Sequence, residues 1–155
     1  MRSKSSGIRG SFSPWHQGHD DILIKTLDIF DRVIVAQGIN PEKAKPVKLD
    51  EKTIGPMISQ RIMDRITIVQ FSGFLHKYIE KFNHDTGPGG QICAVIRGLR
   101  SGYDLDYEAS QMYWNEDLGM KARVVCFITD RKLGHISSSA IRQLEFLREL
   151  ERKNS

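Results

Sequence analysis

Residues 92–96, Ile92-Cys93-Ala94-Val95-Ile96, form a near-continuous apolar run that ends directly before Arg97-Gly98-Leu99-Arg100. A strand covered by helices on both faces has this pattern, because neither face is solvated. Partly β-branched runs of the same kind occupy residues 32–36, 66–71 and 123–128. Together these runs predict four strands of a parallel sheet.

A fifth strand is expected around Gly7-Ile8-Arg9. The segment is polar for a central strand, so this expectation rests on its position before Gly10 and not on an apolar pattern. Helical patterns with one apolar face occupy residues 20–30, 74–82, 104–118 and 138–152. Strand and helix therefore alternate along the chain, which predicts an α/β fold with a doubly wound, five-stranded parallel sheet. In such sheets ligands bind beyond the carboxyl ends of the strands, where the strand order reverses.

The composition is that of one soluble globular domain spanning residues 1–155, with 39% hydrophobic and 27% charged residues. The sequence shows no apolar run long enough to span a bilayer and no apolar segment of a secretory signal near Met1. We therefore predict a cytoplasmic protein without a membrane partner. The net charge of +4 suits an anionic ligand, but no basic block with interleaved aromatic residues predicts nucleic-acid binding. Cys93 and Cys126 are expected to be buried small hydrophobes, and no residue is assigned as a metal ligand.

The first chemical motif is the segment from Gly10 to His19, which follows the weak strand and opens a helix. Gly10 lets backbone approach a ligand closely, and free amide groups at the helix start would lie beside His16 and His19. This arrangement favours phosphate binding. Local hydrogen bonding of the two histidines, or a metal site, remains an alternative.

Two further segments offer groups that suit a polyphosphate. Arg97 and Arg100 flank a glycine after a strand and can present two guanidinium groups, unless they pair with Asp104 and Asp106. Ser137-Ser138-Ser139 opens the last helix, where hydroxyls either cap the helix or bind phosphate together with its amides.

His16-Gln17-Gly18-His19 resembles the HxGH signature of the nucleotidyltransferase superfamily, whose fold is Rossmann-like. Three segments resemble the bacterial phosphopantetheine adenylyltransferase family. They are the Gly10-Ser11-Phe12 frame with Pro14, the Arg97–Arg100 block followed by Asp104, Tyr107, Glu108 and Asn115, and the 136–142 segment. The resemblance covers residues 10–142. It implies transfer of AMP from ATP to 4'-phosphopantetheine, which gives dephospho-coenzyme A and pyrophosphate, with Mg²⁺ bridging the ATP phosphates. It also implies a homo-oligomer, typically a hexamer.

The resemblance assigns roles to individual residues. The catalytic residues would be His19, Lys43 and Arg97. ATP would contact Ser11, Phe12, His16, His19, Gly98, Leu99, Arg100, Glu108, Ile136, Ser137, Ser138 and Ser139. The acceptor would contact Ser11, Lys43, Leu75 and Arg97, with Lys45 as the alternative to Lys43.

The sequence departs from this family at several positions. Bacterial members usually carry Asp where Ser13 stands, Thr where His16 stands and Arg where Glu116 stands. His16 leaves another phosphate acceptor, such as nicotinamide mononucleotide, as an alternative. Ser13 and Glu116 leave a second alternative, that the chain is a nucleotide-binding module that kept the fold and lost catalysis.

Overall fold

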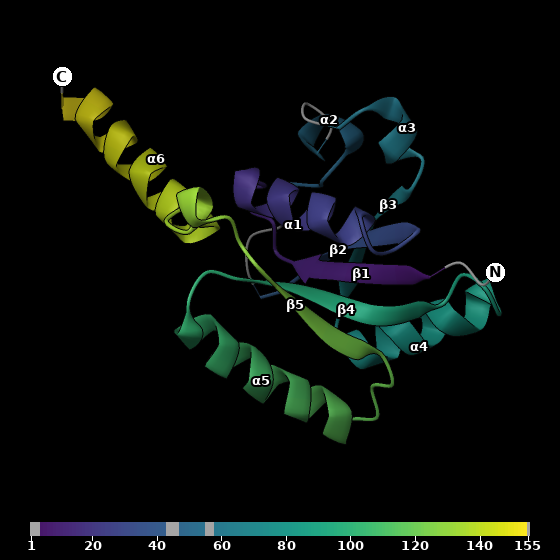
Figure 1. Ribbon diagram of the computed structural model, residues 1–155. Coiled ribbons are helices and arrows are strands. Elements are labelled where there is room, and N and C mark those ends of the chain that lie inside the picture. Colours follow the sequence, from purple (N-terminus) through teal and green to yellow (C-terminus); the bar gives the residue numbers. More distant parts are fainter. Residues whose placement is uncertain (1–3, 43–46, 55–57, 155) are drawn as a thin grey trace.

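The computed structural model describes residues 4–42, 47–54 and 58–154, and within them a five-stranded parallel sheet in the order β3-β2-β1-β4-β5 (Figure 1). The strands are β1 (Ser5–Gly10), β2 (Arg32–Ile39), β3 (Ile66–Ser72), β4 (Ile92–Leu99) and β5 (Arg123–Ile128). The longer helices are α1 (Gln17–Leu27), α4 (Leu75–Thr86), α5 (Gly102–Asp117) and α6 (Ser138–Asn154). Shorter turns form α2 (Glu51–Ile54), α3 (Gln60–Met63) and the 3₁₀ helix η2 (Arg131–Leu133). The predicted α/β fold is confirmed.

The polar strand β1 lies in the middle of the sheet and is bonded to β2 on one side and to β4 on the other. Ser5 and Ser6 are 1% and 0% exposed, so their small side chains are enclosed while the sheet satisfies their backbone groups. The order of the strands reverses between β1 and β4. The loops that follow these two strands are therefore where an open α/β sheet binds its ligands.

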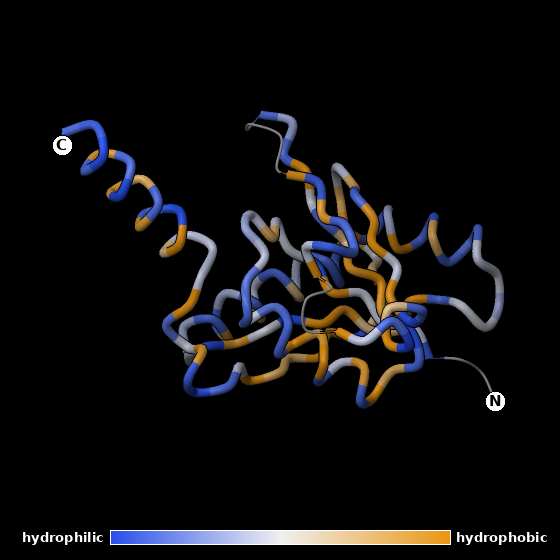
Figure 2. The backbone as a smooth tube through the Cα atoms, turned by 90° about the horizontal axis from the view of Figure 1, so that it is seen from above, coloured by the Kyte–Doolittle hydropathy of each residue, from blue (hydrophilic) through white to orange (hydrophobic). Residues whose placement is uncertain are grey.

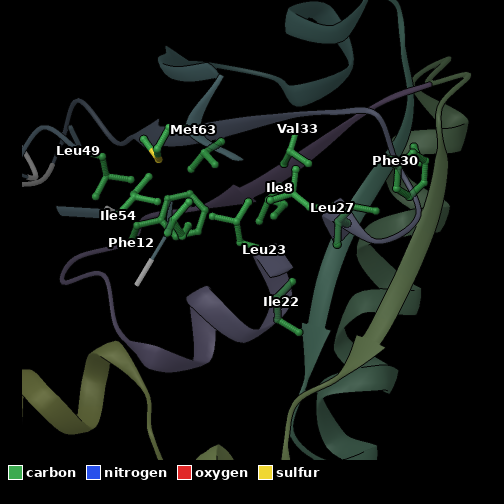
Figure 3. Close-up of a cluster of buried hydrophobic side chains, with 14 residues drawn as sticks. Ile8, Phe12, Ile22, Leu23, Leu27, Phe30, Val33, Leu49, Ile54 and Met63 are labelled. Carbon is green, nitrogen blue, oxygen red and sulfur yellow. The ribbon is translucent and has the colours of Figure 1, made fainter. Parts of the chain in front are cut away.

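Two apolar clusters hold helices on opposite faces of the sheet. In the first, Leu23 and other side chains of α1 pack on Val33 and Val35, and Leu49, Ile54 and Met63 extend the cluster past β2 (Figure 3). In the second, Leu75 and Ile79 of α4 pack on Ile34, Ala36 and Val95. Alternate residues of β2 thus face alternate clusters, as a strand buried on both sides requires.

The C-terminal helix α6 differs from the other long helices. It projects away from the sheet in two perpendicular views (Figures 1 and 2), and none of its described side chains is buried. The apolar stripe predicted from the sequence is Ile141, Leu144, Leu147 and Leu150. Ile141 is half-buried, whereas the other three, and Phe146 beside them, are between 41% and 60% accessible. The part of α6 that approaches the carboxyl end of the sheet is its start, from Ser138 to Arg142.

The prediction of two buried cysteines was wrong, because both side chains are exposed. Cys126 belongs to β5, an edge strand that pairs only with β4 and has less cover than the strands between. Cys93 lines a hollow at the amino end of β4, beside His76 and Met120. An apolar run predicts a strand, but it does not tell which of its positions a helix covers.

Candidate active site

A cavity of about 500 Å³ opens at the carboxyl end of the sheet. It brings together three segments that lie far apart in the sequence: the loop after β1 with the start of α1, the end of β4 with the start of α5, and the start of α6. The predicted site residues that line it are Ser11, Phe12, His16, His19, Arg97, Gly98, Arg100, Glu108, Ile136, Ser137, Ser138 and Ser139. The sequence motifs therefore converge on one cleft.

Phe12 anchors the loop after β1. Its ring is 3% exposed and lies among Leu23, Ile54 and other residues of the first cluster (Figure 3), although its backbone adopts a left-handed φ of 47°. A Cβ on Gly10 would stand 2.6 Å from this ring, so only glycine leaves room for it. The strained turn is stabilised by burial of Phe12 and directs the chain across the mouth of the cavity.

His16 and His19 form a reciprocal cap at the start of α1. The Nδ1 atom of His16 accepts the N–H of Gly18 at 3.1 Å, and Nδ1 of His19 accepts the N–H of His16 at 3.2 Å. The two rings stack with centroids 3.7 Å apart, while Phe12 meets His19 edge-on at 5.0 Å. Because each Nδ1 is an acceptor, a neutral ring carries its proton on Nε2.

Burial lowers the pKa of His19 to about 3, and the neighbouring His16, Arg100 and Arg97 act in the same direction. The pKa of His16 is also lowered, mainly by burial and then by Arg100. Both imidazoles are therefore neutral near pH 7. A neutral ring with a fixed Nε2–H can donate a hydrogen bond to a phosphoryl oxygen without any change in its protonation state. Such a donor suits the stabilisation of charge on phosphoryl oxygens.

Arg97 is held by three acceptor atoms from two residues. Its Nε and Nη2 donate to the two carboxylate oxygens of Glu108 at 2.7 and 2.5 Å, and its Nη1 donates to the carbonyl of Arg9 at 2.6 Å. The side chains of this pair are only 22% and 11% exposed. This two-point contact fixes the plane of the guanidinium group and neutralises much of its charge.

Arg100 lies nearer the surface and pairs with Asp104. Its backbone N–H donates to the Asp104 carboxylate at 2.7 Å, and its Nε and Nη2 donate to the two carboxylate oxygens, each at 3.3 Å. The pairing that the sequence left as an alternative is thus present for Asp104. These side-chain contacts are long and the Arg100 side chain is 42% exposed, so an anion in the cavity can compete for it.

The start of α6 is tied to the loop after β1. Ser137 caps the helix by accepting the N–H of Ala140 at 3.1 Å, and Ser138 donates to the carbonyl of Pro14 at 2.9 Å. Arg142 donates to the carbonyl of Ser13 and to Ser139 Oγ. The N–H of Ile141 likewise donates to the carbonyl of Ser137. Within the described residues the amides of Ser138 and Ser139 have no such acceptor, so this first turn, with the hydroxyl of Ser139, suits an anion in the cavity.

A smaller cavity of about 270 Å³ adjoins the first at the end of β2 and β3. Five residues line both cavities: Arg9, Gly10, Ser11, Arg97 and Tyr107. Gln37, which is fully buried, donates to the carbonyls of Ser11 and Val47 at 3.1 and 2.9 Å and thereby fixes the wall between them. The geometry thus provides two adjoining compartments with a shared, positively charged boundary.

Not every predicted residue lies at the cavities. Leu75 and Leu99 are each 8% exposed, and neither is among the described residues that line the two compartments; Phe71 and Gly73, from the segment before Leu75, line the smaller one. Lys43 and its alternative Lys45 lie outside the described residues.

Five polar side chains line the larger cavity without having been predicted as site residues: Arg9, Asp104, Tyr107, Thr129 and Arg142. Asp104, Tyr107 and Arg142 belong to the recognised motifs but were assigned no ligand. Outside those motifs Arg9 carried a signal, since a charged side chain at the end of a central strand has no place in a core.

The described residues lack two features that would point to a metal or a membrane. They contain no cluster of three or more histidine, cysteine or acidic side chains that could hold a metal ion, and both carboxylates of the larger cavity pair with arginines. No helix in those same ranges has the length and apolar character needed to cross a bilayer.

Comparison with known proteins places the chain among nucleotidyltransferases. The model of the cytidylyltransferase-like family matches residues 8–144. The phosphopantetheine adenylyltransferase of Syntrophomonas wolfei is 36% identical over 138 residues, covering 89% of this chain and 81% of the relative. That of Porphyromonas gingivalis is 34% identical over 147 residues, covering 93% and 88%. A putative nicotinate-nucleotide adenylyltransferase from Vibrio parahaemolyticus shares the fold, with a TM-score of 0.60 at 19% identity over 91% of this chain and 85% of that one.

Proposed function

The chain belongs to the cytidylyltransferase-like family and, within it, to the phosphopantetheine adenylyltransferases, and we propose that it transfers AMP from ATP to 4'-phosphopantetheine. The products are dephospho-coenzyme A and pyrophosphate, so the reaction is a step of coenzyme A synthesis. The single structural observation that carries the proposal is the convergence of three motif-bearing segments on one cavity that adjoins a second.

The two compartments suit two substrates. The larger cavity offers His16, His19, Arg100 and the start of α6, which are the groups that a triphosphate needs. The smaller cavity has apolar walls from Ile39 and Phe71, which suit an uncharged arm that ends in a phosphate. The reacting phosphates would then meet at the shared boundary beside Ser11 and Arg97.

We propose a direct in-line displacement. An oxygen of the acceptor phosphate attacks the α-phosphorus of ATP, and the bond from that phosphorus to the bridging oxygen of the β-phosphate breaks. Pyrophosphate leaves with the electron pair. A phosphate dianion is already nucleophilic at neutral pH, so the enzyme needs neither a general base nor a covalent intermediate, and its task is to orient two polyanions and stabilise the developing charge.

The catalytic roles that the resemblance implies are supported by this arrangement. The Nε2–H of His19 would donate to an oxygen of the α-phosphoryl group, where charge builds in the transition state. Arg100 and the first turn of α6 would hold the β- and γ-phosphates. Arg97, oriented by Glu108, would face the acceptor phosphate. The role of Lys43, which lies outside the described residues, stays a prediction of the resemblance.

Mg²⁺ remains a predicted cofactor, bound by the phosphates of ATP. The described donor set does not form a protein cage for it, because Asp104 and Glu108 already pair with arginines. ATP itself would therefore supply the ligands of the ion, without a described carboxylate of the chain.

The test is pyrophosphate release by the purified chain with ATP and each acceptor in turn. We expect release with 4'-phosphopantetheine, at least 100-fold less with nicotinamide mononucleotide, and loss of the signal when EDTA removes Mg²⁺. Faster pyrophosphate release with nicotinamide mononucleotide would identify that compound as the acceptor instead. ATP binding by calorimetry without release for either acceptor would instead identify a module that has lost catalysis.

Two predictions concern the protein's context. We expect a cytoplasmic enzyme, and we expect it to assemble as a homo-oligomer, a hexamer by resemblance. The exposed apolar stripe of α6 is compatible with an assembly, and sedimentation velocity of the purified chain would show whether it is a monomer instead.

A further inference from the structure

Arg9 occupies the penultimate position of β1, at the centre of the sheet and at the boundary of the two cavities. Its guanidinium group is half-buried, and within the ranges that the structure describes it makes no hydrogen bond or ion pair. The Arg9 backbone pairs with Ala36 in the sheet, and its carbonyl accepts from Arg97. Its surroundings are Arg97, Tyr107 and Glu108. A half-buried guanidinium group without a partner is costly unless a ligand supplies the missing acceptors.

The two arginines at this boundary are not equivalent. Both carboxylate oxygens of Glu108 are engaged by Arg97, which leaves the charge of Arg9 without a direct counterion. Burial and the nearby Arg97 lower the pKa of Arg9 from its usual value, which is the mark of a cation in an unfavourable, positively charged environment. An anion placed between Arg9 and Arg97 would supply the missing counterion and offset the repulsion between the two guanidinium groups.

The geometry points to Arg9 as a binding residue for the terminal phosphate of the acceptor, at the boundary where the small cavity meets the ATP cavity. This inference rests on the proposed function and deepens it by assigning the recognition of a phosphomonoester to a residue outside the recognised motifs. Arg9 donates to the acceptor phosphate, while Arg97 is kept in place by Glu108 beside it. The triphosphate has its own donors in Arg100, the histidines and the start of α6.

The test compares two ligands that differ only in the phosphate, 4'-phosphopantetheine and pantetheine, by calorimetric titration of the parent chain and of Arg9→Gln. Gln retains much of the aliphatic stem and removes the charge. We expect the preference for the phosphorylated ligand to fall about 10- to 100-fold in Arg9→Gln, the loss typical of one charge-assisted contact. Affinity for pantetheine and KM for ATP should stay within about twofold, and Arg9→Lys should recover part of the preference.

The matched control is Arg123→Gln, which removes the same charge from an exposed residue at the amino end of β5 and should leave the preference unchanged. Circular dichroism and thermal melting verify that each variant is folded. An unchanged preference in folded Arg9→Gln, or an equal rise in KM for ATP, overturns the role of Arg9 while the proposed function stands. A parent chain that neither prefers phosphopantetheine nor releases pyrophosphate with it overturns both.

Discussion

Replacement of His19 by alanine is expected to lower turnover by about two to three orders of magnitude, the typical loss when one preorganised donor to developing charge is removed. The ring is fixed by a hydrogen bond at Nδ1, by stacking on His16 and by the edge contact with Phe12, so its Nε2–H points from a rigid support. Its depressed pKa keeps it neutral over the working range. The readout is kcat for pyrophosphate release at saturating ATP and acceptor.

Two further variants separate the donor from the cap. The amide oxygen of His19→Asn can replace Nδ1 as the acceptor for the N–H of His16 but places no donor where Nε2 stands, so this variant should be stable and as slow as His19→Ala. The longer His19→Gln can return a donor and should recover part of the rate. The exposed His84, at the far end of α4, provides the control His84→Ala, which should match the parent. Turnover of His19→Asn within a few-fold of the parent would remove the proposed role.

Arg97→Met is expected to produce the second large effect, on stability and turnover together. Glu108 is 9% exposed, and loss of its partner leaves a buried carboxylate unpaired, which we expect to lower the free energy of unfolding by about 2–4 kcal/mol. The same change places an uncompensated negative charge where two polyanions must meet. Turnover should therefore fall by more than about 100-fold, and KM for the acceptor should rise.

The double variant Arg97→Met/Glu108→Gln distinguishes the structural role from the chemical one. Neutralising the carboxylate removes the buried charge, so most of the lost stability should return in urea unfolding, whereas turnover should stay low because the guanidinium group is still absent. Recovery of turnover along with stability would show that Arg97 serves only to neutralise Glu108.

The sheet was predictable because four of its five strands carry their own signal. Strands buried on both faces, such as β2 and β4, need continuous apolar runs, and the polar β1 could be inferred from the motif that follows it. The one-turn helices α2 and α3 were not predicted, because four residues are too few to show a helical period. The exposure of Cys93 and Cys126 depends on which helix covers which strand, and that is a property of the tertiary structure.

The site was predictable as far as its motifs extend. His19, Arg100 and Ser138 lie on three separate segments and line the same cavity, as the motif order implied. Pairing was harder to predict: nothing in the sequence shows that Glu108 engages Arg97 with both oxygens, since the contact depends on how α5 packs against β4. Arg9 was missed because it was read only as part of a strand, although its charge at the end of a central strand was a signal.

The most direct test of the central claim is a crystal structure of the chain with α,β-methylene-ATP, whose α-phosphorus cannot be transferred, together with 4'-phosphopantetheine. The triphosphate is predicted to lie within hydrogen-bond distance of His19 Nε2, Arg100 and the first turn of α6, with the acceptor phosphate between Arg9 and Arg97. A nucleotide bound elsewhere, or a phosphate chain directed away from His19 and Arg100, would contradict the account.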